Sequence, residues 1–145
     1  MHTIGIILTA HGDFAPALLR AAELIVGSQP GVMPLCLSAS DSPESHATQL
    51  QAVLAQVDSG SGVLVLTDLL GGSPANIASL SLGQGVSAVL CGVNLPMLLE
   101  ALTRRDELAL PDLAAAAIRA GQSGIVDAGA TLSARQTVRL ASDSA

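Results

Sequence analysis

Short stretches of consecutive apolar residues predict four β-strands in this chain. They lie at 3–11, 32–37, 62–68 and 86–91. The first and third lack the alternation of a half-buried strand, which is typical of strands buried on both faces of a parallel sheet. Pro34 interrupts the second stretch, and because proline cannot donate to a ladder, this strand is expected at an edge of the sheet.

Between these strands, apolar residues recur every three or four positions, the spacing that predicts helices. The segment 14–26 follows Asp13, a possible N-cap, and precedes Gly27, a possible stop. The segment 43–57 begins with a capping Ser42, a proline and an acidic first turn. Further helical patterns lie at 75–82, 95–105 and 111–120.

Strands that alternate with helices predict an α/β fold with right-handed crossovers. We expect a doubly wound, mainly parallel sheet of four strands, in the order 2-1-3-4. Residues 124–127 are a candidate for a short final strand, and the polar segment after Ser133 is expected to fray. The predicted organisation is a single domain over 1–130 and a polar C-terminal tail over 131–145.

Composition narrows the possible functions of this domain. The 145 residues carry six arginines, no lysine and twelve acidic residues, for a formal charge of −6. A nucleic-acid-binding protein needs a basic face, so that class is excluded. Phe14 is the only aromatic residue, which leaves no platform for stacking bases.

The chain has the features of a cytoplasmic protein. The N-terminus lacks the basic start of a signal peptide, and no segment offers about 20 uninterrupted apolar residues to span a membrane. Cys36 and Cys91 lie in apolar, strand-like stretches. Free, buried thiols of a reduced compartment explain them best, with a disulfide or a catalytic thiol as the less favoured interpretations.

Two predicted strands end in ionisable side chains, His11 and Asp68. If the strand order is 2-1-3-4, the first and third strands are neighbours, and a crevice opens between their carboxyl ends. A carboxylate there would fix the histidine tautomer and leave the other ring nitrogen free as a nucleophile. Taken alone, His11 is equally well explained as a turn residue that satisfies backbone groups.

The sequence Gly71-Gly72-Ser73-Pro74 follows Asp68 and precedes a helical pattern. Glycines permit close approach to a ligand, and free N–H groups at a helix start bind anions. By itself this is also an ordinary turn with Ser73 as N-cap. Beside His11 and Asp68, it suggests phosphoryl transfer through a phosphohistidine.

Other sites are disfavoured by the sequence. There is no dinucleotide fingerprint in the first turn, and a lysine-dependent phosphate loop is impossible without lysine. The histidines and cysteines show no metal-ligand spacing, so we expect no metal and no cofactor. His46 is expected to be a solvated surface residue without a role, and His2 is equally uninformative.

Three stretches, at 9–15, 66–74 and 92–100, together resemble the IIA component of the mannose family of the bacterial sugar phosphotransferase system. The similarity extends from the first strand to about Val126. In this order and spacing, the three stretches are strongly specific. Ala10 stands where the family often has Ser or Thr, and Leu70 where it often has an aromatic residue, which puts partner specificity in question.

The resemblance implies that His11 accepts a phosphoryl group from the phosphocarrier protein HPr and passes it to a IIB component. It implies that Asp68 orients His11, and that Gly71, Gly72 and Ser73 lie near the phosphoryl group. No metal or cofactor is implied. The family also implies a homodimer that exchanges the strand at 124–127, and an indirect membrane association through IIC and IID components.

The chain ends too early for a IIB domain, so we expect IIB to be either a separate protein or missing. Two other functions stay open at this point. The protein could be a regulatory module whose histidine phosphorylation controls binding to another protein. It could also be a small-ligand-binding domain in which His11 is structural.

Overall fold

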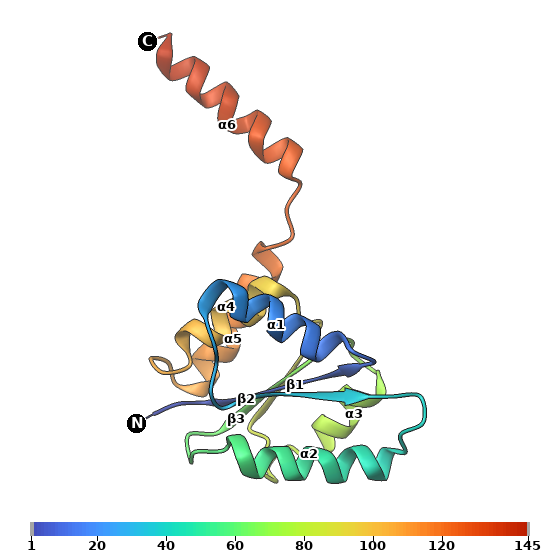
Figure 1. Cartoon of the computed structure of the whole chain (residues 1–145). Coiled ribbons are helices and arrows are strands. Elements are labelled where there is room, and N and C mark those ends of the chain that lie inside the picture. The colour runs from blue at the N-terminus through green and yellow to red at the C-terminus, as the bar shows by residue number, and fades with distance from the viewer. Residues whose placement is uncertain (1, 145) are drawn as a thin grey trace.

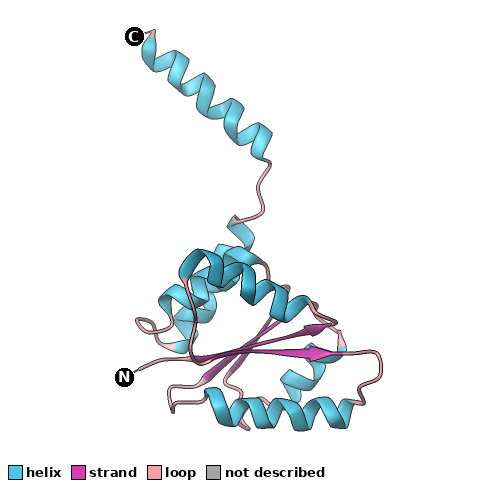
Figure 2. Cartoon of the chain, viewed as in Figure 1, coloured by secondary structure: helices cyan, strands magenta, loops and turns pink. Residues whose placement is uncertain are grey.

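A four-stranded parallel sheet between two layers of helices forms the body of the protein (Figures 1 and 2). The computed structural model describes residues 2–144, so Met1 of the predicted domain and Ala145 of the predicted tail lie outside the described residues. The strand order β2-β1-β3-β4 confirms the predicted doubly wound topology. The strands are β1 (Gly5–His11), β2 (Val32–Leu37), β3 (Val63–Thr67) and β4 (Ala88–Cys91).

Helices cover both faces of the sheet (Figure 1). On one face, α1 (Phe14–Val26), α4 (Leu95–Arg104) and α5 (Leu110–Ser123) pack in one apolar cluster with β1 and β3. On the other face, α2 (Pro43–Val57) and α3 (Ser73–Leu80) pack in a second cluster. Because β1 leads to α1 and β3 leads to α3, the chain leaves these neighbouring strands toward opposite faces. This is the arrangement that opens a crevice at their carboxyl ends.

The central position of β1 and β3 explains their unbroken apolar sequences. Every residue of β3 is buried, and in β1 only the terminal His11 is exposed. β2 is an edge strand, as Pro34 predicts, and Pro34 pairs in register with Leu8 of β1. Cys36 and Cys91 lie on opposite edge strands as free cysteines, and both are partly buried instead of fully buried.

The N-cap residues predicted from the sequence agree only in part with those in the structure. Ser42 caps α2 as predicted, and its hydroxyl accepts a hydrogen bond from the Ser45 N–H at 3.1 Å. Asp13 occupies the N-cap position of α1 without a side-chain hydrogen bond. The prediction that Ser73 caps α3 is wrong, because Gly72 has the extended backbone of an N-cap and Ser73 is the first helical residue.

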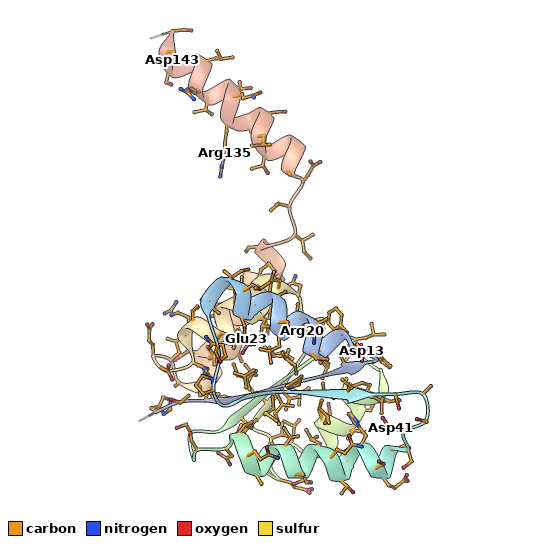
Figure 3. The ribbon with its side chains drawn as sticks, in the orientation of Figure 1. Asp13, Arg20, Glu23, Asp41, Arg135 and Asp143 are labelled. Atoms are coloured by element: carbon orange, nitrogen blue, oxygen red, sulfur yellow. The ribbon has the colours of Figure 1, made fainter. Side chains whose placement is uncertain are left out.

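The C-terminal region differs from the prediction. Residues 124–127 form no strand in the single chain and instead connect α5 to a further helix, α6 (Ala128–Asp143). The Asp127 carboxylate caps α6 by accepting from the Ala130 N–H at 3.0 Å. No residue of α6 is buried, and the helix extends away from the body (Figures 1 and 3). The expectation of a frayed tail overlooked this cap and the helix-favouring Ala, Leu and Arg residues that follow it.

We predict that Gly5→Ala destabilises the protein, because a Cβ on Gly5 would lie 2.5 Å from the Val57 carbonyl oxygen. The backbone cannot give way easily between a central strand and α2. The free energy of unfolding should fall by about 1–3 kcal/mol, the usual cost of overpacking. Urea denaturation at fixed protein concentration measures it.

Gly129→Ala is the matched control, since the new methyl group would lie at an ordinary 3.4 Å from Asp127 on the exposed α6. This control should leave the midpoint unchanged or raise it slightly. Equal midpoints for Gly5→Ala and the wild type would show that β1 and α2 are not packed as closely as described.

Candidate functional site

His11 and Asp68 meet at the carboxyl edge of the sheet, as the predicted strand order requires. His11 ends β1, and Asp68 directly follows β3. The parallel register pairs Thr9 with Thr67, so the carboxyl ends of β1 and β3 lie side by side. One carboxylate oxygen of Asp68, Oδ2, accepts hydrogen bonds from His11 Nδ1 at 2.7 Å and from the His11 backbone N–H at 3.1 Å.

This geometry determines the protonation pattern of the pair. Partial burial acts to raise the pKa of Asp68, but the hydrogen bonds from the His11 ring and backbone together hold it below its ordinary value of 3.8. A charged carboxylate accepts a hydrogen bond and cannot donate one, so Nδ1 of the neutral ring carries the proton. Nε2 is therefore left with a free lone pair. The side chain of His11 is 50% exposed, which makes this nitrogen reachable from solvent.

The predicted glycine-serine turn lies against the histidine ring. A Cβ on Gly72 would lie 2.9 Å from His11 Cε1 and 3.6 Å from Nε2, so only glycine leaves room for the ring here. Gly71 adopts a φ of +82°, a backbone conformation that glycine allows and other residues rarely adopt. The turn therefore needs a glycine at both positions, each for a separate reason.

The start of α3 offers hydrogen-bond donors beside the ring. The helical hydrogen bonds begin with the Asn76 N–H, which donates to the Gly72 carbonyl at 3.0 Å. The N–H groups of Ser73 and Ala75 precede this ladder, and Pro74 has none. Unpaired N–H groups and the positive end of the helix dipole together favour an anion at this position.

A cleft of about 720 Å³ adjoins His11. Asp13 at the start of α1 and Asp41 in the loop before α2 lie on its rim, at the same end of the sheet (Figure 3). Among the described residues that line the cleft, none is lysine or arginine. Helix dipole and hydroxyl groups, rather than side-chain cations, are therefore available to hold an anionic group here. The lining residues are His11, Gly12, Asp13, Leu37, Ser38, Ala39, Asp41 and Ser73.

His46 is not a solvated surface residue, and that prediction is wrong. Its side chain is 0% exposed, and Nε2 lies 2.9 Å from Thr9 Oγ1. The signal was present in the sequence, because residue 46 falls on the helical stripe that continues through Leu50, Val53 and Val57. Burial lowers the pKa of His46, an effect only partly opposed by the charge of Asp41, so the ring is neutral near pH 7.

This geometry defines a class of protein: a doubly wound α/β domain with a histidine–aspartate pair and a glycine-serine turn at the carboxyl edge of its sheet. Comparison with known proteins gives the family. The chain matches the family described as PTS system fructose IIA component over residues 5–118, where PTS denotes the phosphotransferase system. It therefore belongs to this family of IIA components, which confirms the resemblance seen in the sequence.

Individual relatives agree with this membership. The chain is 37% identical over 125 residues to the PTS system mannose-specific EIIAB component of Escherichia coli strain K12. That match covers 85% of this chain and 39% of the relative's length. The PTS system fructose-specific EIIA component of Bacillus subtilis is 32% identical over 111 residues, 76% of each chain. The crystal structure of EIIA from Streptococcus agalactiae superposes with a TM-score of 0.78 and 38% identity, covering 86% of this chain and 96% of that one.

Two further features of the described residues bear on function. Within residues 2–144, no three His, Cys, Asp or Glu side chains are grouped as a metal ion would require. None of the described helices combines the length and the apolar character needed to cross a bilayer.

Asp68→Asn should change how stability depends on pH. Because the folded-state pKa of Asp68 is lowered, its ionised form stabilises the fold above pH 3.8, and this contribution is lost as the pH falls below that value. The wild type should therefore lose more stability than Asp68→Asn between pH 5 and pH 3. Urea midpoints at the two pH values measure the difference.

The control is Asp143→Asn, at an exposed carboxylate on α6 far from the pair (Figure 3). This variant should follow the wild-type pH dependence. If Asp68→Asn also follows it, the carboxylate does not make the described hydrogen bonds in solution.

Proposed function

We propose that this protein is a phosphohistidine carrier, a phosphotransferase that accepts a phosphoryl group from phospho-HPr on His11 and passes it to a IIB component during sugar uptake. One observation carries the proposal. The 2.7 Å hydrogen bond from Nδ1 to Asp68 leaves Nε2 free, and the ring lies against the turn that opens α3. Membership of the IIA family supports the same conclusion.

In the proposed reaction, the Nε2 lone pair attacks the phosphorus of the donor's phosphohistidine. The new bond joins Nε2 to phosphorus, and the bond between phosphorus and the donor imidazole breaks, so the donor ring leaves with its electron pair. The positive charge that develops on the His11 ring is stabilised through Nδ1–H by Asp68. The N–H groups of Ser73 and Ala75 face the negative charge on the transferring oxygens. Transfer to IIB is the same step in reverse, with the acceptor ring as nucleophile.

The partner assignments belong to the same proposal. HPr is the donor, a IIB component is the acceptor, and the protein acts in the cytoplasm, reaching the membrane only through IIC and IID components. Leu70, at the turn beside His11, is 81% exposed, and Leu69 is 61% exposed. Exposed apolar side chains next to the reacting nitrogen are suited to contact a docked protein.

We predict that incubation with phosphoenolpyruvate, the general phosphotransferase enzyme and HPr adds one acid-labile phosphoryl group to the wild type. His11→Ala should remain unmodified while keeping its circular dichroism spectrum. Asp68→Ala should be phosphorylated roughly a hundredfold more slowly, the usual effect of removing one charge-stabilising group. Intact-mass spectrometry over a time course measures all three.

Each contrary result has a defined meaning. No adduct while HPr itself is phosphorylated would reject HPr as the donor. An adduct on His11→Ala would reject His11 as the acceptor, and an unchanged rate in Asp68→Ala would reject the role of Asp68. Phosphorylation of His11 without transfer to any IIB protein would favour a regulatory module.

We also propose that the protein is a homodimer that exchanges residues 124–127 as a strand. β4 is an edge strand, and a cleft of about 440 Å³ beside it is lined by Leu90, Ile118 and Ile125, among others. Ile125 and Val126 are 79% and 65% exposed in the single chain, an unfavourable state for adjacent β-branched residues. Pairing of this segment with β4 of a second copy would cover both surfaces.

Truncation after Gly121 is expected to abolish the dimer, because it removes the exchanged segment and leaves the β4 edge open. Truncation after Asp127, which removes only α6, is the matched control and should leave the dimer intact. Light scattering gives the mass of each variant. A dimer that survives truncation after Gly121 would exclude strand exchange as its basis.

A further inference from the structure

Buried polar atoms without a hydrogen-bond partner gather beneath the candidate site. Within the described residues, five buried side-chain atoms lack a partner, and three of them belong to this region: His46 Nδ1, Thr67 Oγ1 and Asp68 Oδ1. The other two, Nε and Nη1, belong to Arg105, whose guanidinium donates to the Pro30 carbonyl elsewhere in the fold. Each unsatisfied buried group costs stability, and apolar side chains in these places would avoid the cost. Fold stability therefore does not explain why a histidine lies on the buried face of α2. The place of His46 in the site offers a different explanation.

The hydrogen bond between His46 and Thr9 joins α2 to β1 two residues before His11. Both residues are 0% exposed, and Nε2 and Oγ1 lie 2.9 Å apart. Thr9 precedes His11 by two positions in β1, so the two side chains lie on the same face of the strand. His46 lies in the first turns of α2, directly after the loop at 38–42, which contributes Ser38 and Asp41 to the cleft.

The loop at 38–42 is joined to α2 as a closed unit. Asp41 Oδ2 accepts from the Ser38 N–H at 2.8 Å and from the Ser38 hydroxyl at 2.9 Å. Ser42 caps α2, and its carbonyl accepts from the His46 N–H at 3.0 Å. The loop has two attachments. At its start, Leu37 pairs with His11, and the Leu37 carbonyl accepts from the Gly12 N–H at 2.9 Å. At its other end, the loop continues into α2, so the direction in which it leaves β2 depends on where α2 lies on the sheet.

The remaining contacts of α2 with the sheet are mostly apolar. Leu50, Val53, Leu54 and Val57 form the rest of its buried stripe. Apolar contacts are not directional and tolerate small shifts of a helix, whereas a hydrogen bond at 2.9 Å tolerates much smaller ones. The bond to Thr9 therefore fixes α2 at the end nearest the cleft.

We infer that His46 is a positioning residue for His11: through Thr9 it fixes the α2 end of the loop at 38–42, and with it the position of Asp41 on the cleft beside the phosphoryl acceptor. This inference rests on the proposed function, because the cleft must admit the donor's phosphohistidine at one distance and orientation. His46 itself touches neither the donor nor the phosphoryl group.

The test compares His46→Leu, which fills the space without a hydrogen bond, with His46→Gln, whose amide nitrogen takes the position of Nε2. With phospho-HPr as donor, His46→Leu should lower kcat/KM by about tenfold, mainly through KM, since misplacement by a fraction of an ångström has effects of this order. His46→Gln should stay within about twofold. The melting temperature of His46→Leu should equal or exceed that of the wild type, which separates misplacement from unfolding.

Thr9→Val removes the same hydrogen bond by removing the hydroxyl partner of His46. This variant tests the inference even if His46→Leu does not fold. It should reproduce the loss in kcat/KM, and the double variant should lose no more than either single one, because both remove one shared interaction. Additive losses would overturn the inference, as would wild-type kinetics in both single variants.

A second measurement needs no phosphoryl donor. In the unphosphorylated protein, amide ¹H–¹⁵N shifts of His11, Ser38 and Asp41 should move in His46→Leu and stay in place in His46→Gln. Unmoved shifts would overturn the inference even if the rate fell, and moved shifts with an unchanged rate would overturn the positioning role. If the wild type accepts no phosphoryl group, the proposed function fails, while these shifts still decide whether His46 holds the cleft.

Discussion

The hydrogen bond between His11 Nδ1 and Asp68 Oδ2 depends on the sheet as a whole, because its two residues are 57 positions apart in the chain. It forms only if β1 and β3 are neighbours, parallel, and in the register that pairs Thr9 with Thr67. A shift of one residue would turn His11 to the other face of the sheet. Between two helical layers, β3 is buried throughout and β1 is buried up to His11, and this burial holds the register. The apolar core therefore determines which side chains meet at its edge.

The charged side chains around the cleft are suited to a phosphoryl group that is bound only briefly before transfer. Asp13 and Asp41 lie on the rim, and no lysine or arginine lines the described cleft. In the proposed carrier, a phosphoryl group on Nε2 would meet the N–H groups of α3 and no fixed cation. Backbone donors stabilise its oxygens, while the carboxylates oppose a deep energy minimum. An intermediate that is held moderately is easier to transfer to the next protein than one that is held tightly.

The sequence predicted the elements whose patterns are local and missed those that depend on context. The apolar stretches of β1 and β3 and the prolines and caps around them were sufficient for the fold and for the meeting of His11 and Asp68. His46 was predicted to be exposed because its sequence neighbours are polar. Its spacing from Leu50 and Val53, however, places it on the buried stripe of α2. Residues 124–127 have strand-like side chains but find no strand to pair with inside one chain, so local propensity could not determine their structure.

The two faces of the sheet have separate roles, and this separation explains where the polar residues lie. On the face of α1, α4 and α5, β1 contributes Ile6, Leu8 and Ala10, all part of one apolar cluster. On the face of α2 and α3, the same strand runs from the apolar Ile7 through the polar Thr9 to the ionisable His11. The first face can therefore stabilise the fold without constraint from the site. The second gives up some apolar packing near the carboxyl edge, where the Thr9 hydroxyl is hydrogen-bonded to His46 of α2 and the Asp68 carboxylate accepts a hydrogen bond from the His11 ring.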